Sequence, residues 1–238
     1  MNTATLIEML SYRRVSFSDE EKEFIEKYII PAHPNSYKDG YGNVIIDTCE
    51  KPNTIFSCHT DTVDTKEGFR EIFYDELLNI IYSVDDILGA DDCAGVFIML
   101  QMIAENIPGR YIFHRDEEKY CGGSTYIKEV TPEVLEGINN AIAFDRMGDS
   151  DVITTMMLGE CAGKDFADNL CNALGDEGHS FYPAKGVYTD TMMYRDVIKN
   201  CTNISVGYYN QHSNDEFLDL DFFNWLVNKV KTIDWHSL

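Results

Sequence analysis

Two adjacent carboxylates, Asp91 and Asp92, stand between a glycine and an apolar run of helical length. The run 91–104 predicts a helix, so at least one carboxylate lies at a helix N-terminus, where negative charge is stabilised. Alone, such a pair is typical of an ordinary helix cap. Other metal-binding side chains surround it in the sequence: His59, Asp61, Glu117, Glu118, Asp145 and His212. Carboxylates and imidazoles are the ligands that a pair of divalent cations needs.

These side chains are found after short apolar segments that predict buried strands. The segments are 55–58, 111–113, 141–144 and 203–206. Helical patterns over 91–104, 164–174 and 219–233 alternate with them. This alternation predicts an α/β fold: a three-layer, mixed but mostly parallel sheet with helices on both faces. Because parallel strands end at one edge of a sheet, we expect the acids and imidazoles to meet there.

The remaining pattern adds smaller elements. It predicts helices over 3–12, 18–30, 124–130 and 190–196, a hairpin over 36–48, a strand over 151–155, and a β ribbon formed by 69–74 and 78–83. There is no linker, low-complexity tract or internal repeat. We therefore predict that residues 1–238 form a single catalytic domain.

The composition excludes several classes of partner. The formal net charge is -22, from 41 acidic and 19 basic residues, so nucleic acids and anionic membranes are disfavoured. An acidic surface is typical of a soluble protein; a halophilic source or a cationic substrate are the alternatives. The seven cysteines show no CxxC spacing, and the N-terminus shows no signal sequence. These features predict free thiols and a cytoplasmic location.

Electrostatics explains why this acidic cluster needs metal ions. Five carboxylates in a small volume repel one another and raise each other's pKa. They are Asp61, Asp91, Glu117, Glu118 and Asp145. Two divalent cations nearly cancel that charge, and the imidazoles of His59 and His212 suit zinc, cobalt or manganese. The thiols Cys58 and Cys121, next to these residues, are weaker candidate ligands.

In their order along the chain, these motifs resemble those of the co-catalytic zinc exopeptidases, a superfamily that includes the M20, M28 and M42 peptidases. The resemblance rests on His59-x-Asp61, Gly89-Ala90-Asp91-Asp92-x-Ala94-Gly95, Asp116-Glu117-Glu118, Phe144-Asp145, His212 and the early Asp39-x-x-Gly42-Asn43. The Gly89–Gly95 motif is closest in wording to the peptidase T branch of the M20 family.

The resemblance implies a ligand set. Asp91 would bridge two metal ions, and the Asp91–Asp92 peptide bond is expected to be cis. His59 and Asp145 would complete the protein ligands of one ion. Glu118 and His212 would complete those of the other. The expected cofactors are therefore two divalent ions, with zinc first and cobalt or manganese as alternatives.

The resemblance also implies the roles of three acids that bind no metal. Glu117 would be the general base on a metal-bridging water, Asp61 would orient His59, and Asp92 would support the bridging carboxylate. If the chain is extended there, Glu117 and Glu118 point in opposite directions. The implied reaction is hydrolysis of the amide bond of a short peptide, of the aminopeptidase or dipeptidase type.

The chain departs from the M20 pattern in one respect. M20 enzymes usually insert a lid domain between the last acidic ligand and the final histidine, whereas residues 146–211 here read as core elements. We therefore expect no lid, a layout nearer the M28 enzymes. The lid normally carries the dimer interface and substrate-binding groups, so the sequence predicts neither the oligomeric state nor the terminal specificity.

Weaker substrate-binding candidates follow the core motifs. Thr189-Asp190-Thr191 resembles a substrate-contacting step in the relatives, with helix capping as the ordinary alternative. Tyr188, Tyr208 and Tyr209 are candidate donors to an oxyanion, although core packing is the more common role of a tyrosine.

Two other functions remain open. The same metal pair would serve an N-acyl amino-acid or other amide hydrolase, because the metals recognise only the carbonyl group. The alternative from a different functional class is a protein that binds the metal ions but catalyses no reaction. The presence of Glu117 and Asp61, which such a protein would not need, favours an enzyme.

Overall fold

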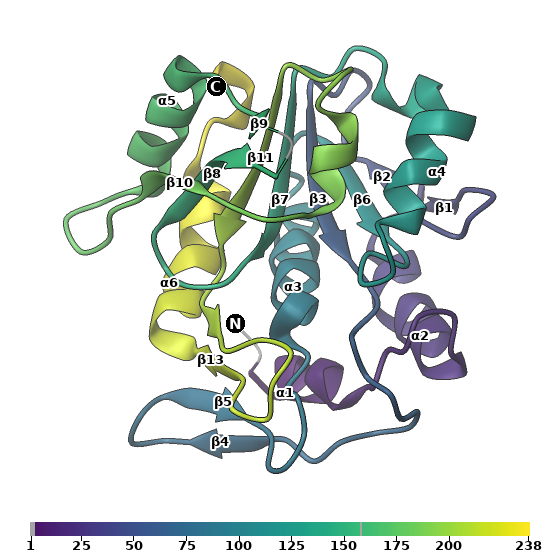
Figure 1. Cartoon of the computed structure of the whole chain (residues 1–238), viewed down its shortest axis with the longest axis vertical. Coiled ribbons are helices and arrows are strands. Elements are labelled where there is room, and N and C mark those ends of the chain that lie inside the picture. Colours follow the sequence, from purple (N-terminus) through teal and green to yellow (C-terminus); the bar gives the residue numbers. More distant parts are fainter. Residues whose placement is uncertain (1–2, 158) are drawn as a thin grey trace.

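The structure, a computed structural model, describes residues 3–157 and 159–238. A nine-stranded sheet forms its centre, in the order β1-β2-β6-β3-β7-β11-β8-β10, with β9 paired to β8 (Figure 1). The strands are β1 Tyr37–Lys38, β2 Val44–Asp47, β3 Thr54–His59, β6 Arg110–His114, β7 Asn140–Arg146, β8 Asp151–Met156, β9 Gly159–Glu160, β10 Tyr182–Lys185 and β11 Asn200–Ser205.

The middle of this sheet is parallel. Strands β6, β3, β7 and β11 run in one direction, while β2 pairs antiparallel with β6 and β8 pairs antiparallel with β11. The register pairs His59 with His114, the last residues of β3 and β6. The strand ends therefore share one edge, as the sequence predicts.

Helices cover both faces of the sheet. They are α1 Thr3–Ser11, α2 Asp19–Phe24, α3 Ala90–Ala104, α4 Gly122–Val130, α5 Lys164–Leu174 and α6 Leu220–Lys229. Side chains alternate between the faces: Phe56 packs in the core beneath α1, α2, α3, α5 and α6, whereas Ile55 packs in a second core with α4 and the 3₁₀ turns 132–135 and 190–194. The three-layer α/β prediction is confirmed.

Helix α3 packs against β3 and β7 through a close contact at Gly95. A Cβ atom there would lie 2.2 Å from the carbonyl oxygen of Phe144 and 2.5 Å from Oδ1 of Asp92. No side chain fits in that space, so the helix lies directly on the strand that carries Asp145. This contact brings the two acidic motifs together.

A second sheet lies below the first in Figure 1, in the order β12-β13-β5-β4. Its strands are β4 Phe73–Asp75, β5 Ile80–Tyr82, β12 Tyr208–Tyr209 and β13 Phe217–Asp219. The sequence predicted the ribbon β4–β5 but not β12 and β13, which are too short to show a pattern. The loop between these two strands carries His212, so its position depends on this sheet.

Other differences from the prediction are local. The predicted helix 18–30 is α2 followed by a π turn (Ile25–Ile29) and a 3₁₀ turn (Ile30–Ala32) that contains Pro31. The predicted helix 190–196 is a 3₁₀ turn, Asp190–Tyr194, and the closing helix ends at Lys229 before a further 3₁₀ turn.

The region 146–211 contains no lid in its described residues, since it supplies β8 to β11 and α5 to the main fold. Across residues 3–157 and 159–238, no helix has both the length and the apolar character that a membrane crossing requires. All seven cysteines are free thiols.

Candidate metal centre and active site

The first candidate metal site is formed by His59, Asp91 and Asp145, at the ends of β3 and β7 and the start of α3. Nε2 of His59 lies 3.0 Å from Oδ1 of Asp91 and 3.5 Å from Oδ1 of Asp145. One candidate ligand atom from each residue lies within 4.8 Å of the other two. Three donors at this spacing can surround a single cation.

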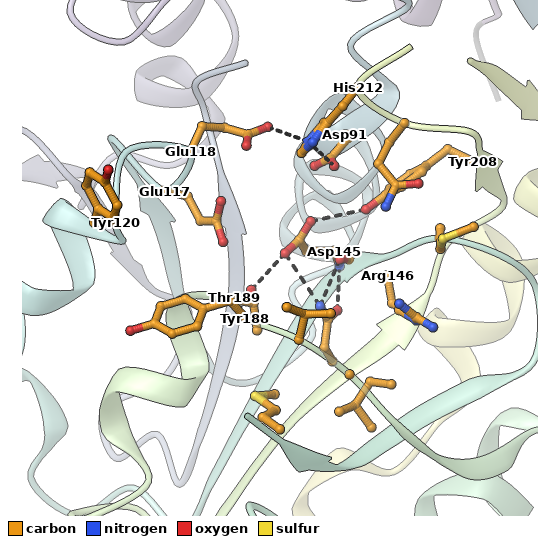
Figure 2. A pocket seen from close by; sticks show the side chains of 17 residues that line it. Asp91, Glu117, Glu118, Tyr120, Asp145, Arg146, Tyr188, Thr189, Tyr208 and His212 are labelled. Carbon is orange, nitrogen blue, oxygen red and sulfur yellow. Dashed lines mark hydrogen bonds and ion pairs between the residues drawn. The ribbon is translucent and has the colours of Figure 1, made fainter. Parts of the chain in front are cut away.

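The second candidate site shares Asp91 with the first and adds Glu118 and His212. Nε2 of His212 lies 3.2 Å from Oδ2 of Asp91 and 3.0 Å from Oε1 of Glu118. Asp91 therefore presents Oδ1 to one group and Oδ2 to the other. A carboxylate in this position can bridge two cations (Figure 2).

The titration behaviour of these residues fits a cation site. Burial opposes a charged ring at His59, but the carboxylates of Asp145, Asp61 and Asp91 outweigh it and raise the pKa of His59 well above its usual value. Hydrogen bonds to Asp91 and Glu118 raise the pKa of His212 to about 10. The acids thus attract positive charge to this place, and divalent cations supply it with neutral imidazoles as ligands. The donor set fits two such ions.

Asp61 links the first site to the loop that follows β6. The ring Nδ1 of His59 hydrogen-bonds the backbone carbonyl of Asp61 at 3.0 Å. The Asp61 carboxylate accepts the backbone N–H groups of Glu117 at 3.0 Å and of Glu118 at 3.2 Å. One residue therefore orients the imidazole through its carbonyl and fixes the position of both glutamates through its carboxylate.

The two glutamates separate for a reason that the sequence did not show. An extended chain would have pointed them in opposite directions, but residues 115–120 form a bend and turn, with Asp116 at φ 66°. Held by Asp61, Glu118 points to His212, whereas Glu117 points into the cavity without joining either ligand group (Figure 2). Burial raises the pKa of Glu117 well above its usual value.

The Asp92 carboxylate supports the backbone next to Asp91 by accepting two backbone hydrogen bonds. Its Oδ1 accepts the N–H of Gly95 at 2.9 Å, which caps α3, and its Oδ2 accepts the N–H of His59 at 3.2 Å. The Asp91–Asp92 peptide bond is cis, as the resemblance implies. Asp92 itself is fully buried and joins neither ligand group.

A buried acid that the sequence did not indicate, Glu216, holds the backbone at Asp91, the residue that both candidate ligand groups share. Glu216 is 2% exposed and accepts four backbone N–H groups. Its Oε2 bonds Leu88 and Gly89 at 2.9 Å, and its Oε1 bonds Ala90 at 2.8 Å and Asp91 at 3.2 Å. The only available signal was its place four residues after His212, and an acid before an apolar strand is common. Glu216 therefore connects the loop between β12 and β13, which carries His212, with the segment 88–91.

Arg14 holds the same segment through the carbonyl of Gly89. Its fully buried guanidinium donates to the carbonyl of Thr60 at 2.8 Å and to the carbonyl of Gly89 at 2.9 Å. Thr60 stands between His59 and Asp61, so this one side chain connects both loops of the first site. Arg14 binds the carbonyl of Gly89, and Glu216 binds its N–H. These two hydrogen bonds fix the backbone that leads to Asp91.

Loss of Glu216 is expected to destabilise the fold. In Glu216→Ala four buried N–H groups lose their partner, so we expect a loss of about 4 kcal/mol in unfolding free energy and a decrease in Tm of about 10 °C. Glu216→Gln keeps one acceptor oxygen and should lower Tm less. Thermal unfolding measures both, with exposed Glu136→Ala as the control. A Glu216→Ala protein as stable as this control would contradict the role.

A cavity of about 530 Å³ opens beside both ligand groups. Tyr188 lines it as expected, but Tyr209 does not; its ring stacks on Phe217 at 5.0 Å. Tyr208 lines the cavity and donates to Oδ1 of Asp145 at 3.2 Å. Two of the three candidate tyrosines thus reach the space where a substrate would bind.

Asp190 lies away from this cavity, contrary to our expectation of a substrate contact. It is 1% exposed, and its carboxylate faces His114 at 3.3 Å. Its neighbour Thr189 lines the cavity instead and donates to Oδ2 of Asp145 at 2.7 Å. We therefore assign no substrate contact to Asp190.

No protein-family model matches this chain, and no curated protein sequence matches it. Solved structures do match. The aminopeptidase PepT from Bacillus cereus has a TM-score of 0.77 and 16% identity, over 96% of each chain. A tripeptidase from Staphylococcus aureus has a TM-score of 0.74 and 15% identity, over 96% of this chain and 95% of that one. The TET aminopeptidase of a marine sediment archaeon of the Thaumarchaeota has a TM-score of 0.74 and 12% identity, over 97% and 96%.

The chain therefore has the fold of known aminopeptidases and a tripeptidase. The resemblance to co-catalytic zinc exopeptidases, stated above from the sequence motifs, is confirmed at the level of the fold. Sequence identities of 12–16% establish only that the folds are alike. The activity therefore has to be argued from the residues of the site.

Proposed function

We propose that this chain is a di-metal peptidase that cleaves an amide bond of short peptides, of the aminopeptidase or dipeptidase type. The observation that carries this proposal is the position of Asp91, shared by two ligand groups at the wall of one cavity. Glu117 faces the same cavity without being a ligand. Aminopeptidase and tripeptidase structures with the same fold support the choice of substrate class.

Two ions would be held by the described residues. His59, Asp91 and Asp145 would hold one, and Asp91, Glu118 and His212 the other. Zinc is the proposed metal because the donors mix imidazole and carboxylate, with cobalt or manganese as alternatives. When bound, such ions lower the pKa of water and polarise the carbonyl of the substrate.

Side chains of the protein then transfer the proton from the water to the leaving group. Glu117 takes a proton from the attacking water and delivers it to the nitrogen of the leaving amine. Glu117 is available for this task because it lines the cavity and belongs to neither ligand group. Asp61 keeps the backbone of Glu117 in place through its 3.0 Å hydrogen bond.

Hydrolysis assays test this proposal. The purified chain is loaded with zinc, cobalt or manganese and given short peptides in two forms, one with a free and one with an acetylated amino terminus. We expect cleavage of the free peptides. Cleavage of the acetylated set alone would indicate an N-acyl amide hydrolase, and the absence of turnover on both sets would contradict the proposal.

Metal removal should lower stability as well as activity. An ion present at 1,000 times its dissociation constant stabilises the native state by about 4 kcal/mol, which corresponds to a rise in Tm of about 10 °C for a chain of this length. We expect this rise when zinc is added to chelator-treated protein. Differential scanning fluorimetry measures it, and an unchanged Tm would contradict a metal site.

We further propose that residues 1–238 act as a single catalytic domain and that the protein works in the cytoplasm. All seven cysteines are unpaired and six are buried, which suits a reducing compartment.

A further inference from the structure

The candidate cavity has one lysine or arginine in its lining, and its role is not explained by the metal site. Among the described residues that line the cavity, Arg146 alone carries a permanent positive charge. It is the last residue of β7 and directly follows the candidate ligand Asp145. In Figure 2 it lies on the other side of Asp145 from Glu117. The Arg146 side chain therefore borders the space where a substrate would bind.

The binding capacity of Arg146 is only partly used. Its Nε and Nη2 donate to the same oxygen, Oδ2 of Asp151, at 3.0 and 2.9 Å. A guanidinium has five N–H donors, so three remain available for another acceptor. The Arg146 side chain is 26% exposed, which leaves these donors accessible. Asp151 orients the guanidinium without saturating it.

The charge balance makes a carboxylate the fitting partner. With two divalent ions bound, the five site carboxylates are nearly neutralised, so they no longer repel an anion from the cavity. Guanidinium groups bind planar carboxylates through paired N–H donors. A peptide whose amide bond lies at the metal centre carries one such group, its own carboxyl terminus.

The size of the cavity limits the length of that peptide. Arg146 and the candidate ligand Asp145 are neighbours at the end of β7, and both line the same cavity of about 530 Å³. A cavity of this volume suits a ligand of two or three residues, with its amide bond at Asp145 and its carboxyl terminus at Arg146.

We propose that Arg146 binds the terminal carboxylate of a dipeptide or tripeptide and so selects short free peptides as substrates. This inference rests on the proposed peptidase function and adds the recognition of the substrate's far end. The residue is a binding group for specificity and takes no part in proton transfer.

The test compares Leu-Gly-Gly with its carboxyl-terminal amide. For the zinc-loaded full chain, we expect KM to be about ten-fold lower for the free acid, the effect of one charged hydrogen-bonding pair. In Arg146→Gln the ratio of the two KM values should fall to about one. Asp151→Asn removes the negative charge beside Arg146 but keeps the shape and one acceptor oxygen that can still orient the guanidinium, so the ratio should be retained.

Several outcomes would overturn the assignment. An Arg146→Gln enzyme whose KM rises by the same factor for both peptides, so that the ratio of the two KM values is kept, would show that Arg146 only holds the β7–β8 turn through Asp151. Calorimetry with Glu117→Gln protein gives a readout without turnover: equal affinity for acid and amide would reject the role of Arg146. Failure of the wild-type chain to cleave either peptide would instead reject the proposed function.

Discussion

Replacement of Glu117 by glutamine should lower kcat by about 10³-fold while the metal content stays the same. General acid–base catalysis contributes roughly 10²–10⁴-fold to such reactions. The amide that replaces the carboxylate occupies the same volume but cannot accept the proton. Glu117 lies outside both ligand groups, so its loss should not release the ions.

Three measurements on Glu117→Gln separate catalysis from structure: kcat on a short peptide, metal content by elemental analysis, and Tm. The control is Glu129→Gln, the same substitution at an exposed position of α4, which should match the wild-type protein in all three. A Glu117→Gln enzyme with kcat within ten-fold of wild type would show that another group takes the proton.

Replacement of Asp91 by asparagine should have a still larger effect, because Asp91 belongs to both ligand groups. The neutral amide keeps the shape but removes the charge that two cations share. We expect both ions to be lost and kcat to fall by about 10⁴-fold, equivalent to about 5 kcal/mol of transition-state stabilisation. The rise in Tm on addition of zinc should also disappear.

Asp145→Asn provides the matched comparison, since Asp145 belongs to the first group alone. This variant should retain the second ion, held by Glu118 and His212, and part of the metal-dependent stabilisation. Elemental analysis of the two variants therefore distinguishes a shared ligand from an ordinary one. If Asp91→Asn kept two ions per chain, the bridging position would be wrong.

These predictions depend on the buried hydrogen bonds that hold the backbone around Asp91. Glu216 accepts the N–H of Gly89, Arg14 donates to its carbonyl, and both side chains are buried. The Asp91 carboxylate therefore points toward His59 and His212 because its backbone is fixed by charge-assisted hydrogen bonds. Such preorganisation limits the free energy lost when the cations order their ligands.

The sequence by itself was sufficient to predict the fold class and the edge of the sheet at which the acids and imidazoles meet, and the resemblance of its motifs implied which of them form the candidate ligand set. Short apolar strands that alternate with helices determine a parallel sheet covered on both faces, and its strand ends form one edge. His59 and Asp145 are found at that edge because each ends or nearly ends a strand. This information is local, so periodicity and motif spacing could show it.

Only the tertiary structure decided how those side chains are held. Glu216 and Gly89 are 127 positions apart, and Arg14 and Gly89 are 75 apart. No periodic pattern reports a hydrogen bond between such distant residues. The second sheet, which carries His212, consists of strands of two or three residues that have too few side chains to show alternation. The direction of Glu117 likewise depends on the carboxylate of Asp61, 56 positions earlier. The sequence thus determines which groups are available for chemistry, while long-range hydrogen bonds and packing determine where each of them points.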